Sequence, residues 1–104
     1  KRGRPGMTPE EARDALGVCR EEIDAIDRRL VALLNERTRV VERIGAIKQN
    51  VSMPVYEPKR EDAVYANIQG ANGGPITNDA IRRIFERIID EMRTLQRMRM
   101  EGGK

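Results

Sequence analysis

A stretch of about forty residues, from Thr8 to about Gln49, contains no proline after Pro9. Apolar residues recur along it at steps of three and four, which predicts one long amphipathic helix of roughly 60 Å at 1.5 Å per residue. Thr8 and Glu11 have the spacing of a capping box, so we expect the helix to begin there. The apolar positions are Leu16, Cys19, Ile23, Ile26, Leu30, Leu33, Val40, Ile44 and Ile47.

Two further helices are predicted beyond a proline-containing loop at about residues 50–57. A short helix covers about residues 58–69, and residues 70–75, rich in glycine and asparagine, form the clearest break in the chain. Thr77 can then cap a third helix of medium length, which frays near Gly102. The fold class is therefore all-α, with one very long, one short and one medium helix.

The predicted long helix exceeds the width of a compact domain of 104 residues. Two shorter helices cannot cover its whole apolar stripe, so we expect a second chain to cover it in a helical homodimer. A plain coiled coil is the competing architecture. It suits the regular spacing but not the short helix and the glycine-rich break. We assign residues 8–101 to one helical domain, 1–7 to a flexible tail or cloning remnant, and 102–104 to a disordered end.

Cationic side chains interrupt the apolar stripe at Arg20, Arg37 and Lys48. Arg37 and Lys48 are eleven residues apart, close to three turns, and so share a face about 16 Å apart. A buried charge is costly unless it is paired, and two on one inward face predict an anionic ligand. Arg20 lies about 26 Å from Arg37 along the helix, so an antiparallel partner chain would have to deliver it. Gln96 takes the place of an apolar residue on the inner face of the third helix.

Simpler readings of these positions exist. Arg37 could pair with a buried carboxylate such as Asp27, and a single buried polar residue can fix the register of a coiled coil. Arg60 and Glu61 alone would be an ordinary solvated pair.

Composition excludes several kinds of chemistry. The chain has no histidine, and its single cysteine, Cys19, permits neither an internal disulfide nor a cysteine-based zinc site. We read Cys19 as a small core residue.

No apolar run approaches a membrane span and no secretory signal is visible, so we expect a cytoplasmic protein without a membrane partner. The net charge of +3 does not by itself imply nucleic acid. Residues 1–6 resemble a minor-groove arm only over Arg-Gly-Arg-Pro, so we do not expect a nucleic-acid partner.

Several sequence blocks, taken together with their spacing, resemble the small all-helical chorismate mutases (AroQ class) from about Glu11 to Arg99. The blocks are Cys-Arg-Glu-Glu-Ile-Asp-Ala-Ile-Asp (19–27), Leu-Leu-Asn-Glu-Arg (33–37), Ile-Gly-Ala-Ile-Lys (44–48), Pro-Val-Tyr-Glu-Pro-Lys-Arg-Glu (54–61) and Ile-Phe-Glu-Arg-Ile-Ile-Asp-Glu-Met (84–92), followed by Gln96.

The resemblance implies an intertwined homodimer with two equivalent active sites. It implies that one chain brings Arg37, Lys48 and Arg60 to the substrate and that the partner chain brings Arg20. The remaining implied contacts are Glu57 and Glu61 around the ring hydroxyl and Gln96 at the ether oxygen. The family often has a small polar residue where this chain has Met92, which leaves one carboxylate contact without its usual group.

The implied reaction is the intramolecular rearrangement of chorismate to prephenate in phenylalanine and tyrosine biosynthesis. It needs no nucleophile, metal or cofactor, because the protein has only to hold the dianionic substrate in its reactive shape and stabilise charge on the ether oxygen. Arg37, Lys48 and Gln96 are the predicted catalytic residues. An isochorismate pyruvate lyase and a non-catalytic domain that senses chorismate or prephenate remain alternatives, and an aromatic-pathway enzyme is a possible partner.

Overall fold

The structure, a computed structural model, describes residues 6–102, and this range contains three helices and no strand. The helices are α1 (Pro9–Asn50), α2 (Pro58–Ala71) and α3 (Asn78–Gly102). The predicted all-α class and the order of long, short and medium helices are confirmed. Helix α3 includes Gly102, whereas the sequence predicts a disordered end over residues 102–104. Residues 1–5, which contain the Arg-Gly-Arg-Pro run, and residues 103–104 lie outside the described range.

The chain divides into two compact units, Lys1–Arg37 and Thr38–Lys104. The first unit contains most of α1. The second contains the last turns of α1, the following loop, α2 and α3.

Helix α1 begins at the predicted capping box. The Glu11 backbone N–H donates to Thr8 Oγ1 at 3.0 Å, and the Thr8 N–H donates to Glu11 Oε1 at 2.9 Å. Pro9 stands at the first helical position, where its missing N–H leaves no hydrogen bond unmade. This reciprocal pair satisfies two backbone donors that would otherwise have no partner.

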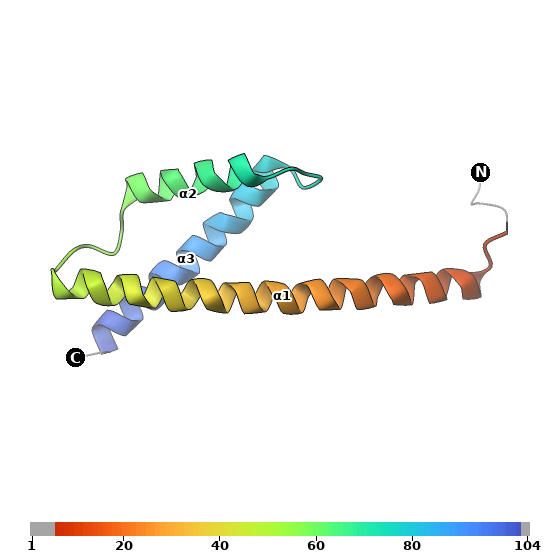
Figure 1. The fold of residues 1–104 in the computed structure, drawn as a ribbon, viewed down its shortest axis with the longest axis horizontal. Coiled ribbons are helices and arrows are strands. Elements are labelled where there is room, and N and C mark those ends of the chain that lie inside the picture. Colours follow the sequence, from red (N-terminus) through yellow and green to blue (C-terminus); the bar gives the residue numbers. More distant parts are fainter. Residues whose placement is uncertain (1–5, 103–104) are drawn as a thin grey trace. The chain divides into compact units, whose positions relative to one another are not determined.

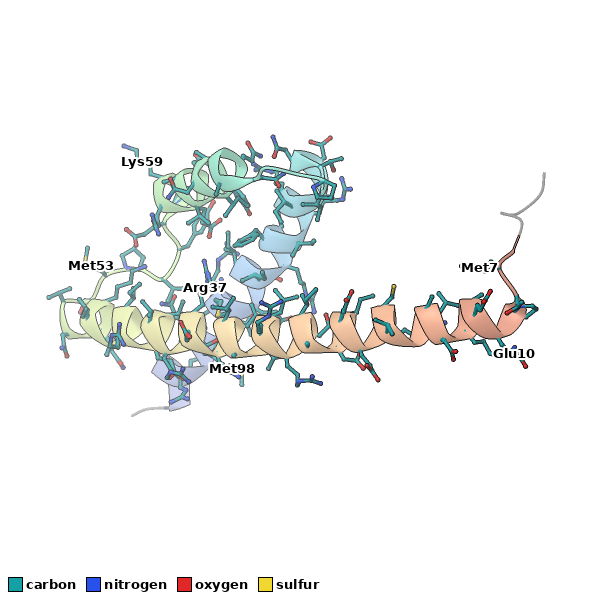
Figure 2. All side chains as sticks on the ribbon, turned by 45° about the vertical axis from the view of Figure 1, so that its right-hand side comes forward. Met7, Glu10, Arg37, Met53, Lys59 and Met98 are labelled. Carbon is teal, nitrogen blue, oxygen red and sulfur yellow. The ribbon has the colours of Figure 1, made fainter. Side chains whose placement is uncertain are left out.

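Helix α1 ends in a Schellman motif, in which a residue of left-handed conformation turns the chain out of the helix. Ser52 has φ 57°, the Met53 N–H donates to the Lys48 carbonyl at 2.8 Å, and the Ser52 N–H lies 3.4 Å from the Gln49 carbonyl. Figure 2 labels Met53 in the loop that follows. The loop returns toward Lys48, whose ammonium group donates to the Val55 carbonyl at 3.1 Å.

The turn between α2 and α3 is organised by one side chain. The Asn72 amide donates to the Ile76 carbonyl at 2.9 Å and to Asn78 Oδ1 at 2.8 Å, while its oxygen accepts the Gly74 N–H at 3.0 Å. The predicted N-cap of α3 is present, because Thr77 Oγ1 accepts the Ala80 N–H at 3.1 Å.

Within the second unit, α2 returns from the end of α1 and α3 reverses direction again to cross the last turns of α1 (Figure 1). Half-buried side chains of α2 and α3 pack between these two helices. Among the described residues, Ile89 of α3 is the one large apolar side chain classed as buried, at 8 % exposed. A single chain therefore has a very small apolar core. The half-buried packing residues are Val64, Tyr65, Ile68, Ile81, Phe85 and Ile88.

The apolar stripe of α1 is exposed in the single chain. Cys19 is exposed too, so the expectation that it is a core residue is wrong for one chain taken alone. The stripe residues, 41–62 % exposed, are Leu16, Ile23, Ile26, Leu30, Leu33, Val40, Ile44 and Ile47.

None of the three helices, over residues 6–102, is long and apolar enough to cross a membrane.

Candidate active site

Lys48, in the last turn of α1, is buried, with 8 % of the residue exposed. Its ammonium group lies 2.7 Å from Glu57 Oε1 and donates to the Val55 carbonyl at 3.1 Å. The Schellman turn makes this contact possible, because it brings the loop back over the helix end. An ammonium group has three hydrogens. Two are used here, and the third can serve a ligand.

Gln96 on α3 is the second buried polar side chain, also 8 % exposed. Its Nε2 donates to the Val41 carbonyl of α1 at 3.1 Å. Its side chain lies over Gly45, where an added Cβ would stand 3.6 Å from Gln96 Cγ. That distance is an ordinary van der Waals contact, so a Cβ would fit there. The Gln96 amide has a second hydrogen for a further acceptor.

Glu61, in the first turn of α2, pairs with Arg93 of α3 through its Oε2 atom. Each side chain is 22 % exposed. The hydrogen bond from Arg93 to Glu61 raises the pKa of the guanidinium above its usual value. The same guanidinium lies over the Tyr56 ring, 5.1 Å from its centroid, and 3.7 Å from Asp90. Three segments of the second unit therefore meet at Arg93.

Sequence reasoning missed Arg93, and it paired Glu61, in the simpler reading, with Arg60. Arg60 is exposed on α2, and the partner of Glu61 comes from α3 instead. A signal for this was present, because Arg93 lies three residues before Gln96 and so near the same inward face of α3.

Met92 is half-buried against α1, where its sulfur accepts a hydrogen bond from the Thr38 hydroxyl at 3.4 Å. Sulfur is a weak acceptor, so this contact mainly positions the thioether.

Some of the predicted site residues belong to the second unit and others to the first. In the second unit, Lys48 and Glu57 are in contact, and Gln96 meets α1 within two turns of Lys48. Arg20 and Arg37 belong to the first unit, where Arg20 is exposed on α1 and Arg37 is half-buried on it (labelled in Figure 2).

Gln96 also lines a cavity of about 240 Å³ between α1 and α3. The Glu42–Arg99 ion pair, at 2.5 Å, lies at this cavity. Within residues 6–102, no three acidic or cysteine side chains gather as a metal site.

Comparison with known proteins assigns the chain to a family. The sequence profile of the chorismate mutase type II family matches residues 19–97. This chain belongs to that family. A solved chorismate mutase from Thermus thermophilus (Form II) superposes with a TM-score of 0.78 at 32 % identity, covering 80 % of this chain and 94 % of that one.

Two curated relatives show the range of lengths in the family. The bifunctional chorismate mutase/prephenate dehydratase of Aquifex aeolicus is 35 % identical over 88 residues, which are 81 % of this chain but 24 % of that protein. The chain thus spans about a quarter of the length of such bifunctional relatives. The chorismate mutase of Methanocaldococcus jannaschii is 27 % identical over 89 residues, 85 % of this chain and 90 % of that protein.

Proposed function

We propose that this chain catalyses the rearrangement of chorismate to prephenate. The observation that carries the proposal is a pair of buried polar side chains, Lys48 on α1 and Gln96 on α3. Gln96 contacts α1 at Val41 and Gly45, within two turns of Lys48 along that helix. Each retains a hydrogen that no acceptor among residues 6–102 uses. Buried donors with spare hydrogens suit an oxygen that becomes negative during a reaction.

In this mechanism the ether C–O bond breaks as the new C–C bond forms within one molecule. Negative charge grows on the ether oxygen, and Lys48 and Gln96 donate to it. The Lys48 ammonium is held in place by Glu57 and the Val55 carbonyl, so little reorganisation is needed. The group transferred never leaves the substrate, and no covalent bond to the protein forms.

Cations bind the two carboxylates of the substrate in the proposal. Arg37 and Arg60 serve from one chain, and Arg20 serves from the partner. Arginine suits this task because its planar fork can donate two parallel hydrogen bonds to one carboxylate. Glu57 and Glu61, at the start of α2, are proposed to face the ring hydroxyl. Met92 contributes an apolar surface in place of a polar contact.

An antiparallel homodimer is part of the proposal. The exposed apolar stripe of α1 supports it, because so many large apolar side chains at helical spacing leave an extended surface uncovered. Fully burying one such side chain contributes about 1.5–3 kcal/mol, so pairing two stripes would supply the apolar core that one chain lacks.

We further propose that the protein works in the cytoplasm in aromatic amino acid biosynthesis. A chain with one cysteine and no possible internal disulfide suits a reducing compartment. The bifunctional relatives join a chorismate mutase to a prephenate dehydratase in one protein, which favours a prephenate-consuming enzyme as partner.

The test is direct. Purified protein is mixed with chorismate, the loss of ultraviolet absorbance is followed, and the product is identified by chromatography, with and without a chelator. Prephenate formed at the same rate in both samples supports the proposal. Release of pyruvate would indicate the lyase alternative, and binding of chorismate without turnover would indicate a sensing domain.

A further inference from the structure

Two carboxylates stand one helical turn apart at the beginning of α2. Glu57 is the N-cap residue, and Glu61 follows it by four residues, with its N–H donating to the Glu57 carbonyl at 3.1 Å. Like charges at this spacing repel each other. They would also repel any dianion that binds beside them, so a dianion site that contains them needs compensating charge.

Each carboxylate receives a cation from a different helix. Lys48 of α1 lies 2.7 Å from Glu57, and Arg93 of α3 pairs with Glu61. Lys48 is already among the proposed catalytic residues. Arg93 is not, although its side chain is as little exposed as that of Glu61.

On the basis of the proposed function, we propose that Arg93 is a positioning residue of the substrate site. It neutralises Glu61 and fixes its orientation, so that the start of α2 accepts a dianionic substrate. Arg93 bonds to Oε2 of Glu61, and the other carboxylate oxygen keeps its acceptor capacity for a hydroxyl group.

The surroundings of Arg93 explain why an arginine suits this position. Its planar guanidinium lies over the Tyr56 ring while it donates to Glu61, and Asp90 on its own helix lies 3.7 Å away. Tyr56 directly precedes Glu57. Arg93 therefore holds both the carboxylate and the segment that leads to the neighbouring carboxylate.

The chain offers a matched control for this cluster. Arg82 on α3 also lies over a tyrosine of α2, 3.9 Å from the Tyr65 ring centroid, and also pairs with a glutamate, Glu86, at 3.4 Å. That glutamate is on α3 itself and none of the three residues belongs to the proposed site. Replacing Arg82 removes the same kinds of contact but leaves the Arg93–Glu61 ion pair in place.

The experiment measures kcat and KM for chorismate in the parent, Arg93→Met, Arg82→Met, Glu61→Gln and the double variant Arg93→Met/Glu61→Gln. We expect Arg93→Met to raise KM about tenfold at low salt, the scale of one partly solvated charge acting on a dianion. The increase should shrink as salt screens the charge. Arg82→Met should leave KM near the parental value.

The double variant decides the mechanism. Once Glu61 is neutral, removing Arg93 should raise KM by no more than about threefold, because the site carboxylate that Arg93 compensates is gone. If Arg93→Met raises KM equally with Glu61 or with glutamine present, then Arg93 acts on the substrate or on the fold, and the proposal is overturned. An unchanged KM in Arg93→Met would overturn it as well.

A second variant covers the case in which Arg93→Met does not fold, as judged by circular dichroism. Arg93→Lys keeps the positive charge beside Glu61 but loses the planar group over Tyr56, so KM should stay within about threefold of the parent if charge compensation is the role of this residue. A tenfold rise in folded Arg93→Lys would show that charge compensation is not the role of this residue. A parent without any activity on chorismate would refute the proposed function, and with it this inference.

Discussion

Replacing Gln96 by glutamate should make the enzyme depend on acid. In the structure Gln96 is 8 % exposed, and its amide donates to the Val41 carbonyl at 3.1 Å. A carboxylate there would face that carbonyl without a hydrogen to share, and it would repel the ether oxygen as charge develops. Loss of one such donor costs about 100- to 1,000-fold in rate, which is the decrease we expect in kcat at pH 8.

Acidification should restore part of this activity. A protonated glutamic acid has one hydrogen, whereas the amide has two. It can serve either the Val41 carbonyl or the ether oxygen, but not both together. We therefore expect kcat/KM of Gln96→Glu to rise about tenfold or more from pH 8 to pH 5 while staying below the parental value.

The folded state of the Gln96→Glu variant should also be more stable in acid than at pH 8. Burial disfavours a carboxylate, so a glutamate at position 96 holds its proton more tightly in the folded than in the unfolded chain. Its stabilising contribution is full below the unfolded pKa of about 4.3 and is lost as the pH rises through the higher folded pKa. The unfavourable buried charge then costs about 1–3 kcal/mol at pH 8. Thermal unfolding at pH 4.5 and pH 8 should show the gap to the parent widening with pH.

The control is Gln69→Glu, which adds the same charge near the far end of α2. Its activity should follow the parental pH profile. If Gln96→Glu also follows the parental profile, Gln96 does not donate to the reacting oxygen, and the mechanism proposed above is wrong at that point.

Two further predictions test the dimer and the α2–α3 interface. Arg20→Ala and Arg37→Ala should each be nearly inactive as homodimers, whereas equal amounts refolded together should recover roughly a quarter of parental activity, since half of the dimers are mixed and each has one intact site of two. Heterodimers that form and stay inactive would contradict a site shared between chains. Burial, and after it the charge of Glu86, raises the pKa of the Tyr65 phenol above its usual 10.0. In a Tyr56→Phe variant, alkaline absorbance titration should therefore give a midpoint above that pH, and Glu86→Gln should lower it.

Much of the fold could be predicted because local signals mark the helix ends. The capping box at Thr8 and Glu11 and the cap at Thr77 are short-range hydrogen bonds between residues three apart, and such bonds can be recognised from sequence alone. The inward placement of Lys48 and Gln96 was also predictable, since each interrupts an apolar period on its helix.

The partners of the buried groups were not predictable in the same way. The Val55 carbonyl that holds Lys48 belongs to a loop backbone, and a backbone acceptor has no sequence signature. The Glu61–Arg93 pair depends on how α2 and α3 are rotated about their axes, and residue spacing within each helix does not specify that rotation. Helix positions could thus be derived from periodicity, whereas contacts between helices could not.

The very small apolar core of one chain has a consequence for how the protein responds to its own abundance. If the folded state is reached by pairing, folding and association are one equilibrium, and the melting temperature rises with total protein concentration. Mutations in the exposed stripe of α1 would then act first on the concentration at which half of the chains are paired. A cell that makes too little of such a protein would lose the folded form, as well as some of the catalyst, by dilution.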